Sequence, residues 1–250
     1  MSTPVIGARS LSRTAPDGGR LSLVLPEAAG EVEWFGATRF AGGGTARDFS
    51  FAEVGQYRVI PKKIFPGGQH EVFRRTGFDL HTFEAANRTD SCLVWVGPHS
   101  EMTTWFGGPL PRTDVLNRLV SSVRFTDSPT GATVSSHSST VQQHTTILIA
   151  QNDRLIMMFR DARSARPLVP EWQGLAHGDG ELWRTSRALD ADDLARVRGT
   201  ALEWRYHVAN PTAYFDVSFH APHSVAALDA ADVDALATAV LDGTRASWSH

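Results

Sequence analysis

Alternation of apolar and polar residues over short segments is the feature that most limits how this chain can fold. Within short segments between residues 20 and 97, apolar side chains recur at every second position, as in Leu21, Leu23 and Leu25. Segments rich in Gly and Pro, such as APDGG, AGGG and FPGGQ, separate these runs. A two-residue period puts one face of a strand into a core, and the Gly- and Pro-rich segments are typical of turns. The pattern predicts an antiparallel, β-sandwich-like N-terminal half.

The second half of the sequence adds helical patterns to the strand patterns. Residues 228–243 (LDAADVDALATAVLDG) place five apolar side chains on one helical stripe, namely Val233, Leu236, Ala237, Val240 and Leu241. We therefore expect a mainly β, α+β protein with a C-terminal amphipathic helix. The FGGPLPR segment suggests a β-sandwich-like domain over residues 1–108 and an α+β domain with β-hairpins over residues 109–250. The alternative is one extended sheet in which the helix expected from TDVLNRLVSSV, residues 113–123, is only a crossing connection.

The segment DFSFAEVGQYRV, residues 48–59, predicts a strand, a corner and a second strand. Tyr57 follows Gly55 and shares a strand face with Val59. This position favours a tyrosine corner, in which the hydroxyl bonds to backbone a few residues upstream. A surface tyrosine beside a ligand is the alternative.

The charge composition argues against a protein that binds nucleic acid or an anionic membrane. Twenty-four Lys and Arg residues against 27 Asp and Glu residues give a net charge of −3, which does not favour nucleic acid or an anionic membrane surface. Lysine occurs only at Lys62 and Lys63, and such an arginine bias is typical of a GC-rich, bacterial genome.

Cys92 is the only cysteine, so a disulfide within the chain is impossible, and its apolar neighbours predict a buried side chain. Without a recognisable signal peptide or membrane span, we expect a soluble, cytoplasmic protein.

The clearest hairpin pattern covers residues 201–220, ALEWRYHVANPTAYFDVSFH. A turn centred on Asn210 and Pro211 predicts that Arg205 lies opposite Asp216 and that His207 lies opposite Tyr214. One face of this hairpin is apolar and the other is polar. The polar face is expected to be either a solvated sheet surface or the floor of a polar cleft. A cleft would offer acid–base chemistry through His207, Tyr214, Asp216, Arg205 and His220.

Metal and nucleophile signatures are weak. His220 and His223 are the candidate metal ligands, but Pro222 lies between them and the helical two-histidine pattern is therefore excluded. The sequence lacks a G-x-S-x-G nucleophile motif and a P-loop. We expect neither a metal nor a cofactor.

Tryptophans in irregular segments form the candidate binding site. Trp172 and Trp183 lie in a loop stiffened by Pro167 and Pro170, and Trp105 closes the first half of the sequence. Tryptophan in a loop can anchor a partner protein or stack on a sugar, although Trp172 and Trp183 could instead plug the open end of a sandwich.

Two function classes follow from these features. The first is a non-enzymatic binding or assembly protein that engages a protein or glycan partner through its β modules and aromatic loop. The alternative is a small-molecule enzyme, such as an isomerase, cyclase or hydrolase, that uses the polar face of the 201–220 hairpin. The sequence does not predict an oligomeric state.

Overall fold

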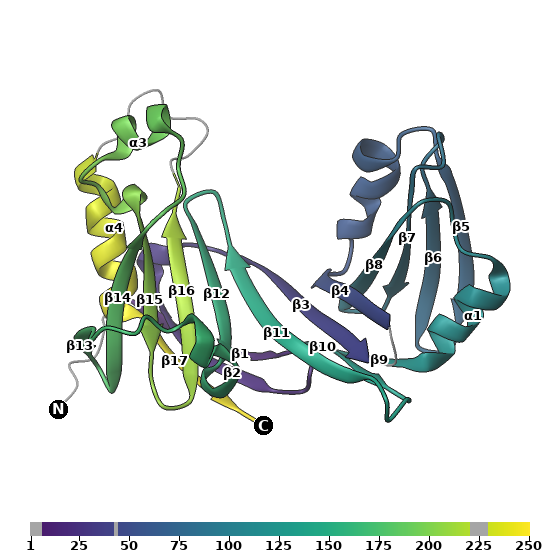
Figure 1. Ribbon diagram of the computed structural model, residues 1–250, viewed down its shortest axis with the longest axis horizontal. Coiled ribbons are helices and arrows are strands. Elements are labelled where there is room, and N and C mark those ends of the chain that lie inside the picture. Colours follow the sequence, from purple (N-terminus) through teal and green to yellow (C-terminus); the bar gives the residue numbers. More distant parts are fainter. Residues whose placement is uncertain (1–6, 43–44, 221–229) are drawn as a thin grey trace. The chain divides into compact units, whose positions relative to one another are not determined.

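The computed structural model describes residues 7–42, 45–220 and 230–250. The chain is mainly β, with antiparallel sheets and a helix near its C-terminus, which confirms the fold class predicted from the sequence (Figure 1). Its described residues form two compact units. One unit comprises residues 7–13, 20–34, 148–220 and 230–250, and the other comprises residues 14–19, 35–42 and 45–147. Residue 108 lies inside the second unit, and a division of the chain there stays a sequence-based prediction.

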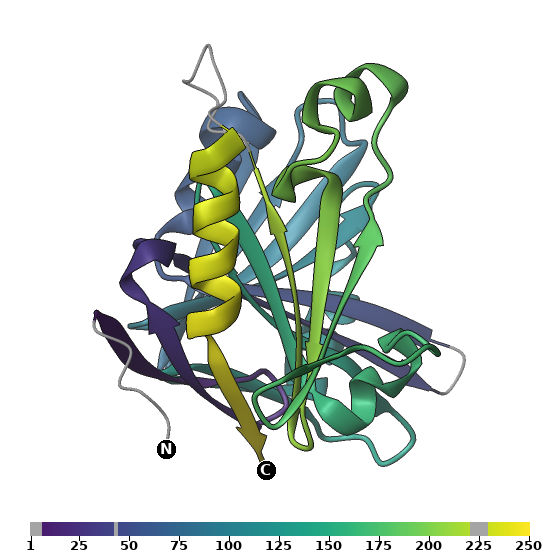
Figure 2. The same ribbon diagram turned by 90° about the vertical axis from the view of Figure 1, so that its left-hand side faces the viewer.

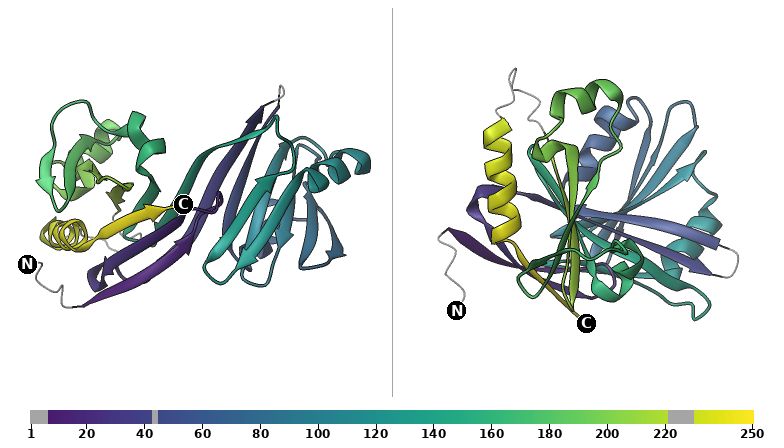
Figure 3. Two further views of the ribbon diagram at one scale, coloured as in Figure 1. Left: turned by 90° about the horizontal axis from the view of Figure 1, so that it is seen from below. Right: turned by 60° about the vertical axis from the view of Figure 1, so that its left-hand side comes forward.

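Two groups of strands build the first unit. A three-stranded sheet has the order β1 (Ala8–Thr14), β2 (Arg20–Pro26) and β17 (Arg245–Ser249), and Figure 3 shows β17 following the last helix. The other strands follow the order β13 (Leu175–His177), β14 (Gly180–Ser186), β15 (Trp204–Ala209), β16 (Ala213–Phe219), β12 (Leu155–Asp161) and β11 (Gln142–Gln151), which belongs to this unit from Leu148 on. Short helices connect them, namely η1 (Glu27–Ala29), α2 (Ala162–Ala165), η4 (Arg166–Leu168), α3 (Ala191–Val197) and η5 (Ala201–Glu203).

The C-terminal helix α4 (Ala230–Gly243) is amphipathic, as the sequence predicts. It packs against β2, η1 and η5 and lies alongside β15 and β16 in Figure 2. The stripe expected from the sequence is buried along its whole length, through Val233, Leu236, Ala237, Val240 and Leu241. Leu21, Leu23 and Leu25 of β2 are also buried, because alternation places all three on the same face of their strand.

The strands of the second unit carry a core on each face. Their order is β3 (Glu33–Gly42), β4 (Thr45–Glu53), β8 (Ser100–Gly107), β7 (Asp90–Val96), β6 (Phe78–Glu84) and β5 (Gln69–Arg75). One core joins Phe49 and Trp95 to side chains of α1 (Thr113–Ser122) and of the hairpin β9 (Val123–Ser128) and β10 (Gly131–Ser136). The other core comprises Ile60, Phe65, Phe83, Cys92 and Val94.

The expected strand around Tyr57 is a helix instead. Gln56–Val59 form the 3-10 helix η2, and Ile60–Ile64 form the π-helix η3. The turn into η2 is made by Gly55, which has a φ of 112° in the left-handed region. Within the described residues the Tyr57 hydroxyl has no hydrogen bond; its ring instead packs on the His81 ring, with centroids 4.7 Å apart. The tyrosine-corner interpretation is therefore wrong, because two alternating residues are too few to distinguish a strand from a helical turn.

The 201–220 hairpin has the predicted faces but a different register. Arg205 pairs with Ser218 and His207 with Asp216, which is a shift of two residues from the expected pairing. The turn lies one residue later than expected, because the backbone N–H of Asn210 donates to the Ala213 carbonyl. The Asn210 side chain accepts hydrogen bonds from the backbone of the residues that follow it, as in an Asx-turn. A shift of two residues leaves each side chain on its original face.

Candidate functional site

Three side chains on the polar face of the hairpin are buried rather than washed by solvent. His207, Tyr214 and Asp216 are only 8%, 1% and 3% exposed. β15 is flanked by β14 and β16 is flanked by β12, so both strands of the hairpin lie inside the strand order of the first unit. Residues from four strands therefore surround the candidate acid–base groups.

His207 is the centre of a closed hydrogen-bond network. Its Nδ1 lies 2.7 Å from the Tyr214 hydroxyl and its Nε2 lies 2.9 Å from Thr185 Oγ1. Burial lowers the pKa of His207 and raises the pKa of Tyr214, so both groups are uncharged at neutral pH. If the Tyr214 hydroxyl donates to Nδ1, then Nε2–H donates to Thr185, and each group in the network is satisfied.

Asp216 forms an ion pair with Arg205 beside this network. Arg205 donates from Nε to Oδ1 of Asp216 at 2.8 Å, and its Nη2 lies 2.6 Å from the same oxygen. Burial raises the pKa of Asp216, while the charge and hydrogen bond of Arg205 lower it. His220 lies just past the end of β16, where its backbone N–H donates to the Arg154 carbonyl. The structure thus joins His207, Tyr214, Asp216 and Arg205 into one cluster on the polar face.

Two members of this cluster are absent from the sequence-based prediction. Thr185 of β14 binds His207, and Arg160 of β12 pairs across the sheet with Tyr214. The sequence contains a signal for Arg160, because RLIMMFR is a continuous apolar run that ends on a charged residue. Only the strand order reveals that this residue lies beside the hairpin.

Neither a metal cluster nor a reactive thiol is seen in the described residues. Across residues 7–42, 45–220 and 230–250, no three His, Cys, Asp or Glu side chains are grouped so that they could hold a metal ion. His223 lies outside the described residues. Cys92 is fully buried as expected, and burial raises its pKa to about 12, which leaves it protonated at neutral pH.

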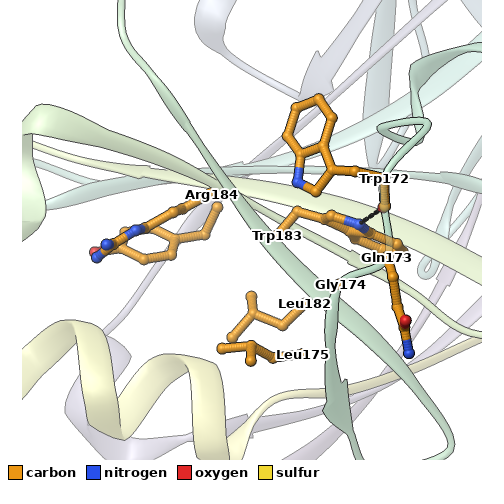
Figure 4. A pocket seen from close by; sticks show the side chains of 8 residues that line it. Trp172, Gln173, Gly174, Leu175, Leu182, Trp183 and Arg184 are labelled. Carbon is orange, nitrogen blue, oxygen red and sulfur yellow. Dashed lines mark hydrogen bonds between the residues drawn. The ribbon is translucent and has the colours of Figure 1, made fainter.

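The two tryptophans of the aromatic loop have different environments. Trp183 is buried at 7% exposure, and its Nε1 donates to the Trp172 carbonyl at 2.7 Å (Figure 4). Trp172 itself is 59% exposed. A second hydrogen bond joins the loop to β14, where the backbone N–H of Gly174 donates to Glu181 Oε2 at 2.8 Å. Trp183 therefore fastens the loop to β14, and Trp172 is displayed on the surface.

A groove of about 550 Å³ lies beside Trp172. We define the loop-edge groove by its lining residues, Trp172, Gln173, Gly174, Leu175, Leu182, Trp183, Arg184 and Tyr206 (Figure 4). Leu175 of β13 is 74% exposed, and Arg184 lies over the Trp204 ring at 4.6 Å. Most of this lining is apolar or aromatic, with one cation among the lining side chains.

Trp105 belongs to the second unit and is not part of the loop-edge groove. It is 46% exposed, and its ring meets the Phe65 ring edge-on, with centroids 5.9 Å apart. A separate depression of about 580 Å³ beside Trp105 is lined by residues of β4, of β8 and of the segment that follows β8. The three tryptophans of the predicted binding set therefore line two different surfaces.

No protein-family model matches the sequence, and comparisons with curated proteins and with solved structures also found no match. Within the described residues, none of the helices combines the length and apolar character needed to cross a membrane.

Proposed function

We propose that this chain is a non-enzymatic binding protein that engages a protein partner at the loop-edge groove. One observation carries the proposal: Trp172 and Leu175 remain 59% and 74% exposed although the loop that presents them is tied down. Ordering a loop before it binds reduces the entropy lost on association. Tryptophan is also the residue type most enriched among the energetically dominant residues of protein interfaces.

The chemistry of the groove favours a protein over a glycan. A sugar site needs polar groups around the aromatic ring, because each hydroxyl of the ligand must find a hydrogen-bond partner. Here the neighbours of Trp172 include Leu175 and Leu182, whose side chains offer no hydrogen bonds. An apolar side chain of a protein partner fits such a lining.

The position of β13 adds backbone groups to this surface. β13 is the last strand in its order, so one of its edges has no neighbouring strand among the described residues. Exposed strand edges accept an additional strand through main-chain hydrogen bonds. A partner strand on β13 would bring its own side chains next to Leu175 and Trp172.

The polar face of the hairpin gives the enzyme hypothesis less support than the loop-edge groove gives the binding proposal. A general base needs a nitrogen or oxygen that can reach the substrate. Both ring nitrogens of His207 already bond to Thr185 and Tyr214, and Tyr214 is almost fully buried. This arrangement is typical of a satisfied core network.

Site-specific photo-crosslinking tests the proposal. A crosslinking amino acid at position 175, introduced in the native host, is expected to capture a discrete protein, whereas one at the exposed Asp153 in the β11–β12 turn is not. Trp172→Ala should abolish the capture at position 175 without lowering the melting temperature, because the removed side chain is exposed. Equal capture at both positions, or capture that Trp172→Ala leaves unchanged, would refute the proposal.

A further inference from the structure

Arg160 has a charged side chain without a hydrogen-bond or ion-pair partner among the described residues. It is the penultimate residue of β12, is only partly exposed, and pairs across the sheet with Tyr214. Its Nε is buried without a hydrogen-bond partner, and its guanidinium forms no hydrogen bond or ion pair with any described residue. Buried polar groups are almost always hydrogen-bonded, so an unpartnered guanidinium indicates a bound water or ion.

Asp216 does not neutralise Arg160. Asp216 lies close enough for its charge to raise the pKa of Arg160, but burial of the guanidinium lowers that pKa by more. The Asp216 carboxylate is already paired with Arg205, which donates from Nε to Oδ1 and places its Nη2 beside the same oxygen. Two guanidinium groups therefore share one carboxylate, which leaves a surplus positive charge on this face.

Arg187 adds a further positive charge near this face, and its own hydrogen bonds do not neutralise that charge. Its Nη1 donates to the carbonyls of Leu202 and Phe219, which carry no net charge. Burial lowers the pKa of Arg187, the charge of Arg205 lowers it further, and the charge of Asp193 raises it. A water molecule can satisfy a donor of Arg160, but only an anion offsets the charge as well.

We propose that Arg160 and Arg205 form a binding site for a small oxyanion, a carboxylate or a phosphate group, on the polar face of β12, β16 and β15. The guanidinium fork of Arg160 supplies parallel N–H donors that match the two oxygens of such a group. Arg205 keeps 39% of its side chain exposed, which gives a small solute access to the same face. None of these residues lines the loop-edge groove, so the site does not depend on the proposed function.

Titration with simple anions tests this site. The full-length protein is titrated with sodium phosphate and, separately, with sodium acetate, while sodium chloride keeps the ionic strength constant. We expect a saturable rise in melting temperature with at least one anion, and the arm with the larger response identifies the preferred group. Arg160→Gln should remove the saturable rise. The control Arg196→Gln should keep it, because Arg196 is 74% exposed and is paired with Asp193 on α3.

If Arg160→Gln does not fold, the variant Arg160→Lys tests whether Arg160 binds the anion. It keeps the charge but lacks the fork, so the anion concentration at half-saturation should rise about tenfold or more, in line with the loss of a bidentate contact. A wild-type protein without any saturable response would show that only water occupies the site. That result, or an unchanged response in a folded Arg160→Gln or Arg160→Lys variant, would overturn the proposal.

Discussion

Glu101 shows how one buried carboxylate can determine the path of a neighbouring segment. Its Oε2 accepts the backbone N–H of Gly55 at 2.9 Å, and the N–H groups of Gln56 and Tyr57 also bond to the carboxylate. These are the first N–H groups of η2, which would otherwise lack an acceptor. The side chain is 3% exposed, and burial raises its pKa to about 7 in spite of these hydrogen bonds.

The pKa of Glu101 predicts a pH-dependent stability. Between the ordinary value of 4.5 and about 7 the folded state binds the proton and the unfolded state does not, so this group's contribution to stability falls as pH rises through that window. Glu101→Gln removes the titration but retains a side chain that can accept hydrogen bonds.

Urea denaturation of both proteins at pH 5, 6, 7 and 8 measures this contribution. The free energy of unfolding of the wild type, minus that of Glu101→Gln, should decrease from pH 5 to pH 8. A difference that is constant or that increases with pH would contradict the assignment.

At the scale of elements, the turns explain why the sequence predicts which face of a strand each side chain takes, but not which residues pair between two strands. The alternation around His207 and Asp216 correctly assigns both residues to one face, but alternation is unchanged by a shift of two residues. The register depends on which residue starts the turn, and the side chain of Asn210 decides this through its bonds to Thr212 and Ala213. Proline then follows at the second turn position, which its fixed φ favours.

Burial of the polar face was not predictable from the hairpin alone. Its cover comes from residues far away in the sequence, such as Arg160 on β12 and Thr185 on β14. By contrast, the stripe of α4 was predictable, because a helix of this length carries its full periodic pattern in one continuous segment.

The η2 segment permits a matched test of backbone conformation. Gly55 has a φ of 112°, which an L-residue adopts only with strain, so Gly55→Ala should destabilise the fold by about 1–2 kcal/mol. Gly107 is the control, because its φ lies outside the left-handed region and an added Cβ would meet nothing within 4 Å. Thermal denaturation should show a clear loss for Gly55→Ala and a near-neutral effect for Gly107→Ala. Equal effects would contradict the described turn.

At the scale of the whole molecule, the division into units makes a prediction about fragments. The core around Phe49 and Trp95 includes Ala132 and Val134, which come from β10. A fragment of residues 1–108 lacks these side chains and the helix α1, so we expect it not to fold cooperatively. Residues 35–147 retain that core and should give a cooperative melting transition by circular dichroism. A cooperative transition from residues 1–108 would instead support the division expected from the sequence.

The central claim is that the exposed pair Trp172 and Leu175 binds a protein, and an affinity measurement with the crosslinked partner tests it most directly. Isothermal titration calorimetry would compare the wild type with Trp172→Ala, and would use Trp105→Ala of the other unit as the control. The account predicts that Kd rises at least about 30-fold for Trp172→Ala, the effect of losing a dominant interface side chain, and changes little for Trp105→Ala. A Kd that is the same for Trp172→Ala and the wild type would contradict it.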